Sequence, residues 1–401
     1  ANVESWCHTL RDYAMLREMI RTCSAAVDMC RNTTEDVKSL LDTIESEIFK
    51  VRNRFVQPEV RDLRGLMQET FEYFMRVYNR EIDPGIPTEY PDLDALIGGG
   101  LKPGEMFVLA ARPSIGKTAI ALNIVRNIMM KDIGGKRKTV AFFSLEMSAD
   151  ELTAKSISRR TYQQCIEYGA NRESLLAVAR TTLDVLRCDI ATQAQSKTFM
   201  EAATAYTEHE AKCLYIVEGM QGVNAAKVRQ LVKQHQQRHG RPPVVFIDYM
   251  QLLTIADTTQ NTDKQKMDAA IKALKDISRD FKIPVVAISS MNRASYDGGL
   301  NMASFKESGN IEYTADVLLA LEAAIPDDCK GDTKTAKEKR LEFFKKNNAR
   351  QRHGEPVKVD IKILKCRTAA PFTTATVDSC NMFNCFMDCR DEVKQVPKLK
   401  L

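Results

Sequence analysis

The sequence predicts an α/β fold in which a helical N-terminal part precedes a large domain with a mostly parallel central sheet. From about residue 100 onward, short apolar segments alternate with helical stretches, which is the pattern of a parallel sheet. Before residue 80 the apolar residues recur at helical spacing instead. The length of 401 residues allows two or three domains, one of them large.

Composition narrows the class of protein without identifying a partner. Hydrophobic residues make up 44% of the chain and charged residues 28%, which excludes wholesale disorder. No apolar run approaches the ~18 residues of a membrane helix and no signal peptide precedes Trp6, so we expect a cytoplasmic protein with no membrane partner. The net charge of +5 neither requires nor excludes nucleic acid.

Three helices are predicted before the sheet. Residues 1–57 form a helical hairpin, whose second helix follows a polar segment that supplies caps and first-turn acids. Pro58 ends this pattern. A third helix within 58–82 carries one strict apolar stripe from Leu63 to Tyr78. Such a stripe must be covered, and packing within its own subunit or on a neighbour fits the sequence about equally well.

Residues 83–401 form the predicted sheet domain. A linker with prolines and the glycines at 98–100 lead into it. The strand-like segments cover 106–110, 139–144, 244–247, 284–289, 317–321 and an alternating stretch over 357–363. The clearest helix between them covers 267–281. Eleven cysteines fit free thiols, and the one cluster, Cys380, Cys385 and Cys389, fits packing better than a structural metal.

A phosphate-binding loop is predicted between the first strand and the helix after it. Residues 111–118 read Ala-Arg-Pro-Ser-Ile-Gly-Lys-Thr, which is a Walker A motif with alanine in place of its first glycine. The loop's backbone N–H groups and the helix N-terminus would hold the phosphates of ATP, the lysine would neutralise them, and the threonine would bind Mg²⁺. The residues concerned are Ser114, Ile115, Gly116, Lys117 and Thr118.

Carboxylates and hydroxyls end three other predicted strands. Asp248 ends the apolar segment 244–248, as in a Walker B strand, and would hold Mg²⁺ directly or through water. Glu146 follows the 139–144 strand and would orient and deprotonate the attacking water, although it could also be a plain acid at a helix N-terminus. Ser289 and Ser290 fit a γ-phosphate sensor and an ordinary strand end equally well.

Together these motifs resemble the DnaB-type replicative DNA helicases, which belong to the RecA-like superfamily and form hexameric rings. The resemblance covers roughly residues 83–390. It is carried, in order, by Gly85–Thr88, Pro91–Asp94, Ala111–Thr118, Ser144–Met147, Ile247–Leu252, Met291–Arg293, Lys306–Glu312, Ala315–Asp316 and Lys365-x-Arg367. It implies a RecA-like P-loop ATPase domain over 83–401, a remnant of the family's N-terminal domain over 1–57 and a linker helix over 58–82. Because the family's globular head is absent and Ala1 stands where Met is usual, we expect a truncated N-terminus.

The resemblance also implies roles for single residues. Lys117, Thr118 and Asp248 would bind ATP and Mg²⁺, and Glu146 would be the catalytic base. Ser290 stands where the family has a γ-phosphate-sensing glutamine.

Two further groups of residues match parts of the family that act between subunits or on DNA. Lys365 and Arg367 match the pair that reaches ATP on the adjacent subunit; by itself, a Lys-x-Arg at a strand tip is more often simply solvated. Lys306, Glu307 and Gly309 match the loop that holds the DNA backbone in the central channel.

The implied function is ATP-driven 5′→3′ movement along single-stranded DNA, with unwinding of forked DNA by a homohexamer. Primase and a helicase loader are possible partners, in a bacterial replisome or during phage replication in a bacterial host. Two alternatives stay open: a RecA-like DNA-remodelling ATPase that forms filaments, and an inactive relative that acts as a scaffold. The departures from the family pattern remove no catalytic group and bear on the coupling of hydrolysis to movement. At these positions the chain has a residue that differs from the usual one of the family: Ser290 replaces a glutamine, Lys155 an arginine, Cys366 an amide residue, Ala369 a glycine and Lys306 the commoner arginine.

Residues 324–358 are longer and more polar than the family pattern. They carry ten Lys and Arg against six Asp and Glu. We expect a solvated or disordered loop there, in preference to a DNA contact.

Overall fold

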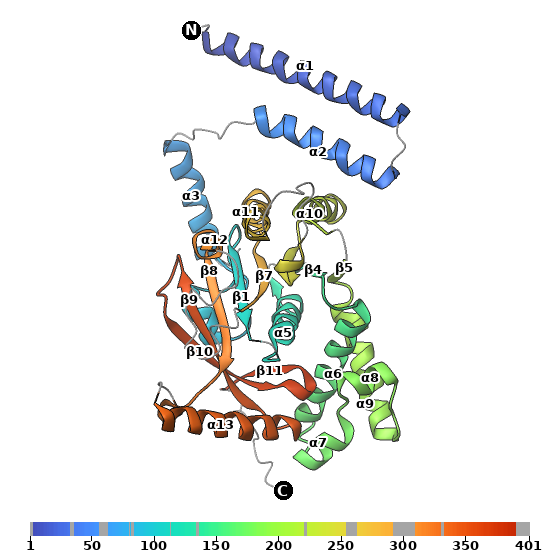
Figure 1. The fold of residues 1–401 in the computed structure, drawn as a ribbon, viewed down its shortest axis with the longest axis vertical. Helices are drawn as coiled ribbons and strands as arrows, with labels where there is room; N and C mark the ends of the chain where they lie inside the picture. The colour runs from blue at the N-terminus through green and yellow to red at the C-terminus, as the bar shows by residue number, and fades with distance from the viewer. Residues whose placement is uncertain are drawn as a thin grey trace. The chain divides into compact units, whose positions relative to one another are not determined.

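The computed structural model describes residues 3–32, 36–55, 63–79, 81, 84–112, 114–133, 136–219, 223–253, 263–291, 309–329 and 333–389. Contacts within the chain separate it into two units, Ala1–Tyr78 and Asn79–Leu401. Figure 1 labels many of the elements of both units.

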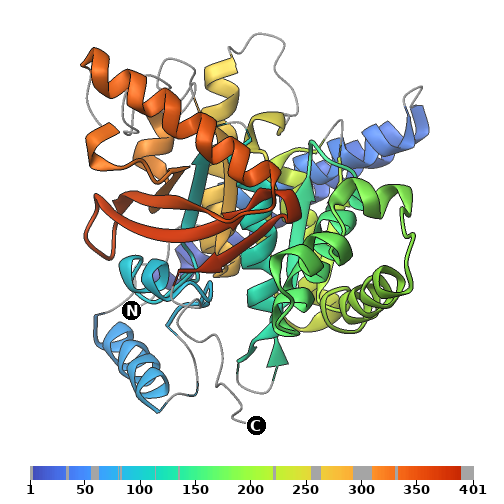
Figure 2. The same ribbon diagram turned by 90° about the horizontal axis from the view of Figure 1, so that it is seen from below.

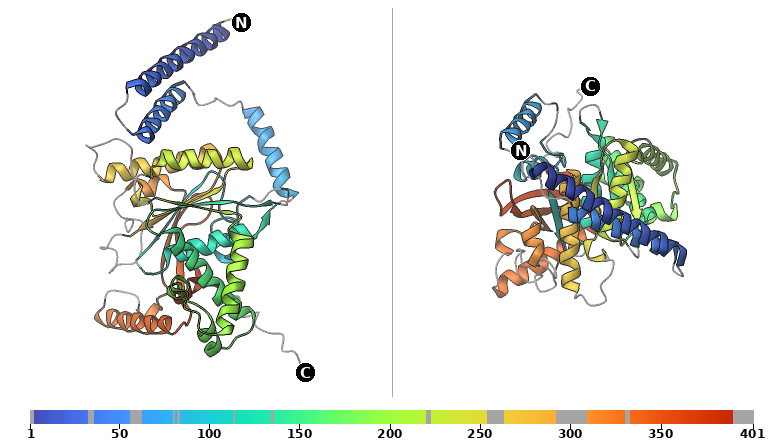
Figure 3. Two further views of the ribbon diagram at one scale, coloured as in Figure 1. Left: turned by 90° about the vertical axis from the view of Figure 1, so that its right-hand side faces the viewer. Right: turned by 90° about the horizontal axis from the view of Figure 1, so that it is seen from above.

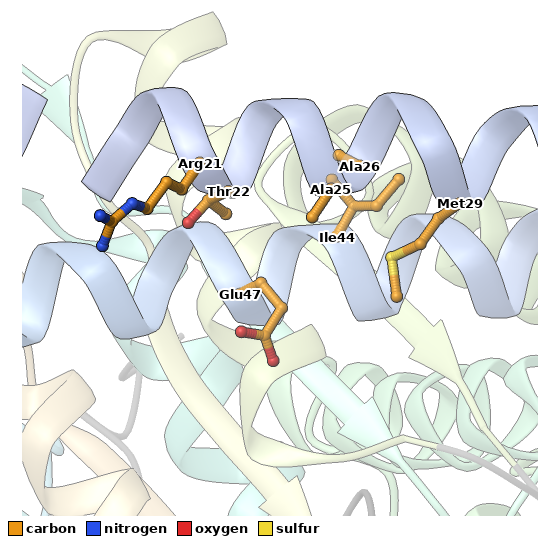
Figure 4. A pocket seen from close by; sticks show the side chains of 7 residues that line it. All are labelled: Arg21, Thr22, Ala25, Ala26, Met29, Ile44 and Glu47. Carbon is orange, nitrogen blue, oxygen red and sulfur yellow. The ribbon is translucent and has the colours of Figure 1, made fainter. Parts of the chain in front are cut away.

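The first unit consists of the three expected helices, α1 (Val3–Asn32), α2 (Val37–Phe55) and α3 (Leu63–Tyr78). The first two pack against one another. Ala25 and Ala26 of α1 lie opposite Ile44 of α2 and leave a shallow hollow between the helices (Figure 4). No side chain of α3 is buried, and the apolar stripe predicted from the sequence is exposed: Phe71 is 64% and Tyr78 83% accessible.

The second unit is built on a sheet of nine strands among the described residues, in the order β11-β10-β9-β8-β1-β7-β6-β4-β5. The six strands from β8 to β5 are parallel, and β9, β10 and β11 join in antiparallel pairs. Their bounds are β1 Met106–Ala111, β4 Val140–Ser144, β5 Leu214–Glu218, β6 Val244–Asp248, β7 Val285–Ser290, β8 Val317–Ala323, β9 Val357–Cys366, β10 Thr373–Cys380 and β11 Cys385–Asp388. The α/β class with a largely parallel sheet is therefore confirmed.

Helices cover both faces of this sheet, because alternate residues of each strand point to opposite faces. Phe107 and Leu109 of β1 join the core beneath α5 (Lys117–Met130) and α6 (Ala149–Glu167). Met106, Val108 and Ala110 join the core beneath α10 (Ala225–His239) and α11 (Asp263–Phe281). Figure 3 shows the sheet between these two layers.

Shorter elements complete the unit. They are α4 Pro91–Leu96, β2 Asp132–Ile133, β3 Lys136–Arg137, α7 Arg172–Val178, α8 Thr182–Arg187, α9 Gln193–Ala205, a π-helix η1 Tyr206–Glu210, α12 Gly309–Thr314, α13 Lys334–Arg352 and the 3₁₀ turns η2 Met250–Leu252, η5 Asp327–Cys329 and η6 Asn381–Phe383. At the start of the unit, Ile86 and Leu101 form an isolated bridge. Gly100 has a φ of 103° beside it, and a Cβ there would collide with the Ile86 carbonyl.

The expectation of a loop over residues 324–358 is wrong for its central part. Residues 334–352 form the 19-residue helix α13. Thr333 caps it, since its hydroxyl accepts the backbone N–H of Ala336 at 3.2 Å. Lys, Arg, Ala and Glu are strong helix formers, so high charge did not prevent a helix here.

Two of the three clustered cysteines pack in a core of the described part of the chain. Cys380 and Cys385 are buried in a small core with Tyr162 and Phe383. Burial raises the pKa of Cys380 to about 11 and that of Cys385 to about 12, which keeps both as neutral thiols. Among the residues described, no helix is long and apolar enough to span a bilayer.

Candidate functional site

The phosphate loop lies where β1 ends and α5 begins, at the carboxyl edge of the parallel strands. Gly116, the residue before α5, has a φ of 102°, in the left-handed region that favours glycine. A Cβ at Gly116 would lie 3.0 Å from Oδ1 of Asn381 and 3.1 Å from the ring of Phe386. Ser114 also has a positive φ, of 66°. The loop therefore has the turn geometry that exposes the first N–H groups of α5.

Thr118 and Asp248 meet at the start of α5. The Thr118 hydroxyl donates to Oδ2 of Asp248 at 2.6 Å, and Asp248 is 1% exposed. Burial raises the pKa of Asp248 above its usual value, while the Thr118 hydrogen bond and the Lys117 charge oppose that rise. Its second oxygen, Oδ1, is buried with no hydrogen-bond partner among the described residues. A buried hydroxyl beside a half-satisfied carboxylate fits the oxygen ligands that Mg²⁺ prefers.

Glu146 and Lys117 face each other across this site. Oε2 of Glu146 lies 3.7 Å from Nζ of Lys117, and the Glu146 side chain is half exposed. The main chain explains why Glu146 lies here, because Ser144 pairs in register with Asp248 and the Leu145 N–H donates to the Asp248 carbonyl at 2.8 Å. The Lys117 ammonium also lies 4.5 Å from the centre of the Tyr249 ring. The carboxylate of Glu146 therefore lies beside the lysine of the predicted phosphate loop.

Ser290 lies beside the phosphate loop. It is the last residue of β7 and pairs in register with Ala111, the last residue of β1. The neighbouring Ser289 accepts a hydrogen bond of 2.8 Å from Nε2 of Gln251. Oε1 of Gln251 is buried without a partner among the described residues. The amide of Gln251, which follows the strand that ends at Asp248, therefore lies beside Ser289 and Ser290. The position of Gln251 in the sequence did not predict this contact.

Residues near the C-terminus complete the site from a second direction. Asn381 donates from Nδ2 to the carbonyl of Ser114 at 3.4 Å. Lys155 of α6 donates to Oδ1 of Asn384 at 3.1 Å. Burial lowers the pKa of Lys155, and the nearby Glu151 and Asp248 carboxylates oppose this. The sequence pattern of η6 and β11 carries no phosphate-site signal, and only the tertiary fold brings Asn381 to the loop and Asn384 to Lys155.

Lys365 and Arg367 lie at the amino end of the parallel strands, opposite the phosphate loop at the carboxyl end. Cys366, between them, pairs with Val317 at the start of β8, whereas Ala111 pairs with Leu321 farther along the same strand. Since β1 spans the sheet from Met106 to Ala111, about 16 Å of strand separates the two edges. These two residues therefore do not join the Lys117 site of their own chain.

Both side chains hold the end of α12. Nζ of Lys365 donates to the carbonyls of Glu312 and Ala315 at 2.6 and 2.7 Å. Arg367 donates to the carbonyl of Tyr313 at 3.1 Å. Burial, and after it the Arg367 charge, lower the pKa of Lys365. Of the expected DNA loop, Gly309 is the first residue of α12, while Lys306 and Glu307 lie outside the described residues.

Comparison with known proteins identifies the family of the chain. Residues 85–369 match the family described as "DnaB-like helicase C terminal domain". The chain belongs to this family. The replicative DNA helicase DnaC of Bacillus subtilis (strain 168) and the replicative DNA helicase DnaB of Geobacillus stearothermophilus are each 27% identical to it over 325 residues. That alignment covers 80% of the chain, which spans 65% of the length of each relative.

Solved structures give the same fold for this DnaB-like chain. A solved ATPase domain matches with a TM-score of 0.62 and 20% identity, covering 82% of the chain and 99% of that domain. The structure of a DnaB-like replicative helicase, described together with its interactions with primase, matches with a TM-score of 0.67 and 19% identity, covering 97% and 79%. The second unit thus shares the fold of these two solved structures.

Proposed function

We propose that this chain is the ATP-driven motor of a replicative DNA helicase. The observation that supports this most directly is the composite site at the carboxyl edge of the sheet. There, Lys117, the Thr118–Asp248 pair and Glu146 converge on one loop. Membership of the DnaB-like family, whose curated relatives carry the name replicative DNA helicase, supports the same proposal.

ATP and Mg²⁺ are the proposed cofactors. Backbone N–H groups of residues 114–116 and the Lys117 ammonium hold the phosphates, while Thr118 and Asp248 hold the metal. The metal ion, when bound, neutralises charge that develops on the phosphates. Glu146 orients a water and accepts its proton, for which its half-exposed position gives access. Gln251, Ser289 and Ser290 lie where they can report the presence of the terminal phosphate.

Lys365 and Arg367 are proposed to complete the site of an adjacent subunit. Their place at the far edge of the sheet supports a contact made in trans, and a trans arginine adds ~10³–10⁵ in rate in related hydrolases. Residues 1–57 and 58–82 are proposed as the hairpin of an N-terminal domain and a linker helix. The exposed apolar stripe of α3 supports docking of that helix on a neighbour. The assembly that joins both contacts is a homohexameric ring.

The proposed substrate is single-stranded or forked DNA, held by the loop that ends at Gly309. The 5′→3′ direction follows from the family resemblance, as do primase and a helicase loader as partners. Interactions with primase are described for the DnaB-like replicative helicase whose solved structure shares this fold.

The decisive experiment is displacement of a labelled strand from a fork with a free 5′ tail. Wild type should displace it with ATP and Mg²⁺. Glu146→Gln should bind ATP with similar affinity and lose at least ~10² in hydrolysis and displacement. Glu173→Gln, an exposed glutamate on α7, is the matched control. A Glu146→Gln variant that unwinds at a near-normal rate would contradict the base assignment.

Two simple measurements address the other classes of protein. Filaments instead of rings in negative-stain images with an ATP analogue would favour a DNA-remodelling ATPase. ATP hydrolysis that DNA does not stimulate, with no strand displacement, would favour a scaffold.

A further inference from the structure

Helix α13 carries an unusual concentration of positive charge. Its 19 residues include eight Lys and Arg against two Glu, an excess greater than the net charge of the whole chain. The helix connects β8 to β9 and runs along the surface of the ATPase unit (Figure 2, orange). It is about 28 Å long.

Some of these cations fix the helix in place. Lys339 pairs with Asp328 at 3.1 Å, and Arg350 pairs with Glu355 at 2.9 Å. Arg340 donates to the carbonyl of Cys329 at 3.2 Å. Buried Ala336 and Asn347 mark the side of the helix that faces the protein. This side is anchored, so α13 is held as a fixed surface element.

Four other cations form an exposed stripe along α13. Lys334, Lys337, Lys345 and Arg352 are all exposed, and none has an ion pair or hydrogen bond to any residue that the structure describes. Their spacings of three, eight and seven residues place them within about 80° of one another around a helix. The stripe therefore presents four cations to solvent on one side, over nearly the full length of the helix, and the exposed Glu338 and Glu342 lie along its border.

The chemistry of the stripe fits a polyanion better than a protein surface. Protein interfaces depend on a central group of aromatic and apolar anchors. The only large apolar side chain on the exposed part of α13 is Leu341, which is 58% accessible. Binding to nucleic acid depends instead on several cations that neutralise successive phosphates. A row of lysines and an arginine in which Leu341 is the one large exposed apolar side chain is suited to a phosphate backbone.

We propose that the stripe of Lys334, Lys337, Lys345 and Arg352 on α13 is a second DNA contact, which binds the phosphate backbone outside the loop that ends at Gly309. The contact reads no bases, because it offers point charges instead of donors arranged for base edges. This inference rests on the proposed function, since a protein that does not act on DNA has no use for such a contact.

The test uses the full chain with an ATP analogue and a fourfold variant, Lys334→Gln, Lys337→Gln, Lys345→Gln and Arg352→Gln. Glutamine keeps helix propensity and removes only the charge. The control variant makes the same change in charge at exposed cations of α10 and α11: Lys233→Gln, Arg238→Gln, Lys272→Gln and Arg279→Gln. Fluorescence anisotropy measures affinity against salt for three probes: an oligo-dT strand, a blunt duplex and a fork.

The α13 variant should lose at least about tenfold in affinity for at least one probe. The slope of log affinity against log salt should fall by about 3, because each phosphate contact contributes roughly 0.7–0.9. ATP hydrolysis without DNA should stay unchanged, and the probe that weakens tells whether single or double strand is bound. An unchanged slope on all three probes, or an equal loss in the control variant, would overturn the inference. If wild type binds none of the probes, the proposed function itself fails. That outcome differs from failure of the inference alone, in which wild type binds DNA and the α13 variant binds it equally well.

Discussion

Nη1 of Arg367 lies 3.2 Å from Oδ1 of Asp316, at the start of β8. The other carboxylate oxygen of Asp316 accepts the N–H of Met106 at 2.7 Å and lies 2.5 Å from Nζ of Lys275. Asp316 is 3% exposed. The arginine is thus tied to the first residue of β1, whereas the phosphate loop follows the last residue of that strand. Within one chain, the Arg367 guanidinium and the Lys117 ammonium belong to two different surfaces.

This arrangement predicts that Arg367 acts on ATP bound to a neighbour. Arg367→Ala alone should reduce steady-state hydrolysis by about 10³ or more. Lys117→Ala alone should abolish phosphate binding in its own site. In a mixture of the two variants, some interfaces combine an intact Lys117 with an intact Arg367, so hydrolysis should partly return. The measurement is the ATPase rate of the mixture at several ratios.

The control for this mixture replaces the Arg367→Ala partner with a Lys117→Ala, Arg367→Ala double variant. No interface in that mixture has both groups intact, and its rate should remain at background. Equal rates in the two mixtures would show that Arg367 does not work in trans.

Asp248 predicts a pH dependence of stability in the absence of metal and nucleotide. Burial is the main reason that its folded-state pKa lies above the ordinary carboxyl value. The folded state therefore holds the proton more tightly than the unfolded state, and the unfolding free energy falls as the pH rises through the folded-state pKa. Asp248→Asn should remove this loss, so the stability of the variant relative to wild type should increase as the pH rises above the ordinary carboxyl pKa.

Denaturant unfolding at a series of pH values checks this prediction, with the exposed Asp189→Asn as the control for loss of a carboxylate. Added Mg²⁺ with ADP should reverse the order, because wild type gains stability from ligand binding and Asp248→Asn loses the metal ligand. If the unfolding free energy of Asp248→Asn does not exceed that of wild type at neutral pH, the ionised Asp248 carboxylate carries no burial cost.

The grouping of the candidate phosphate-site residues was predictable because each lies at or just beyond the carboxyl end of a parallel strand. Parallel strands bring their carboxyl ends to one edge, so Lys117, Glu146 and Asp248 could be placed together without a structure. The position of Lys365 and Arg367 could not. It depends on β9 running antiparallel to β8, and that pairing is set by tertiary contacts.

Two other features could not be predicted, for different physical reasons. The segment 373–380 has no run of large apolar residues and was not among the predicted strands; it becomes β10 by pairing with β9. Residues 334–352 have little apolar periodicity, so the helix α13 was not predicted. Its signal lay in the Thr333 cap and in helix propensity instead.

Asn384 gives a stability prediction that separates side-chain from backbone effects. Its φ is 52°, its Nδ2 donates to the Thr182 hydroxyl at 2.8 Å, and its Oδ1 accepts from Lys155 at 3.1 Å. Asn384→Gly keeps the left-handed backbone and loses both hydrogen bonds, at a cost of about 2 kcal/mol. Asn384→Ala loses the same bonds and adds about 1 kcal/mol for a Cβ in the left-handed region. Denaturant unfolding should rank wild type above Asn384→Gly above Asn384→Ala. Equal stability of the two variants would show that the hydrogen bonds, not the backbone conformation, account for the whole cost.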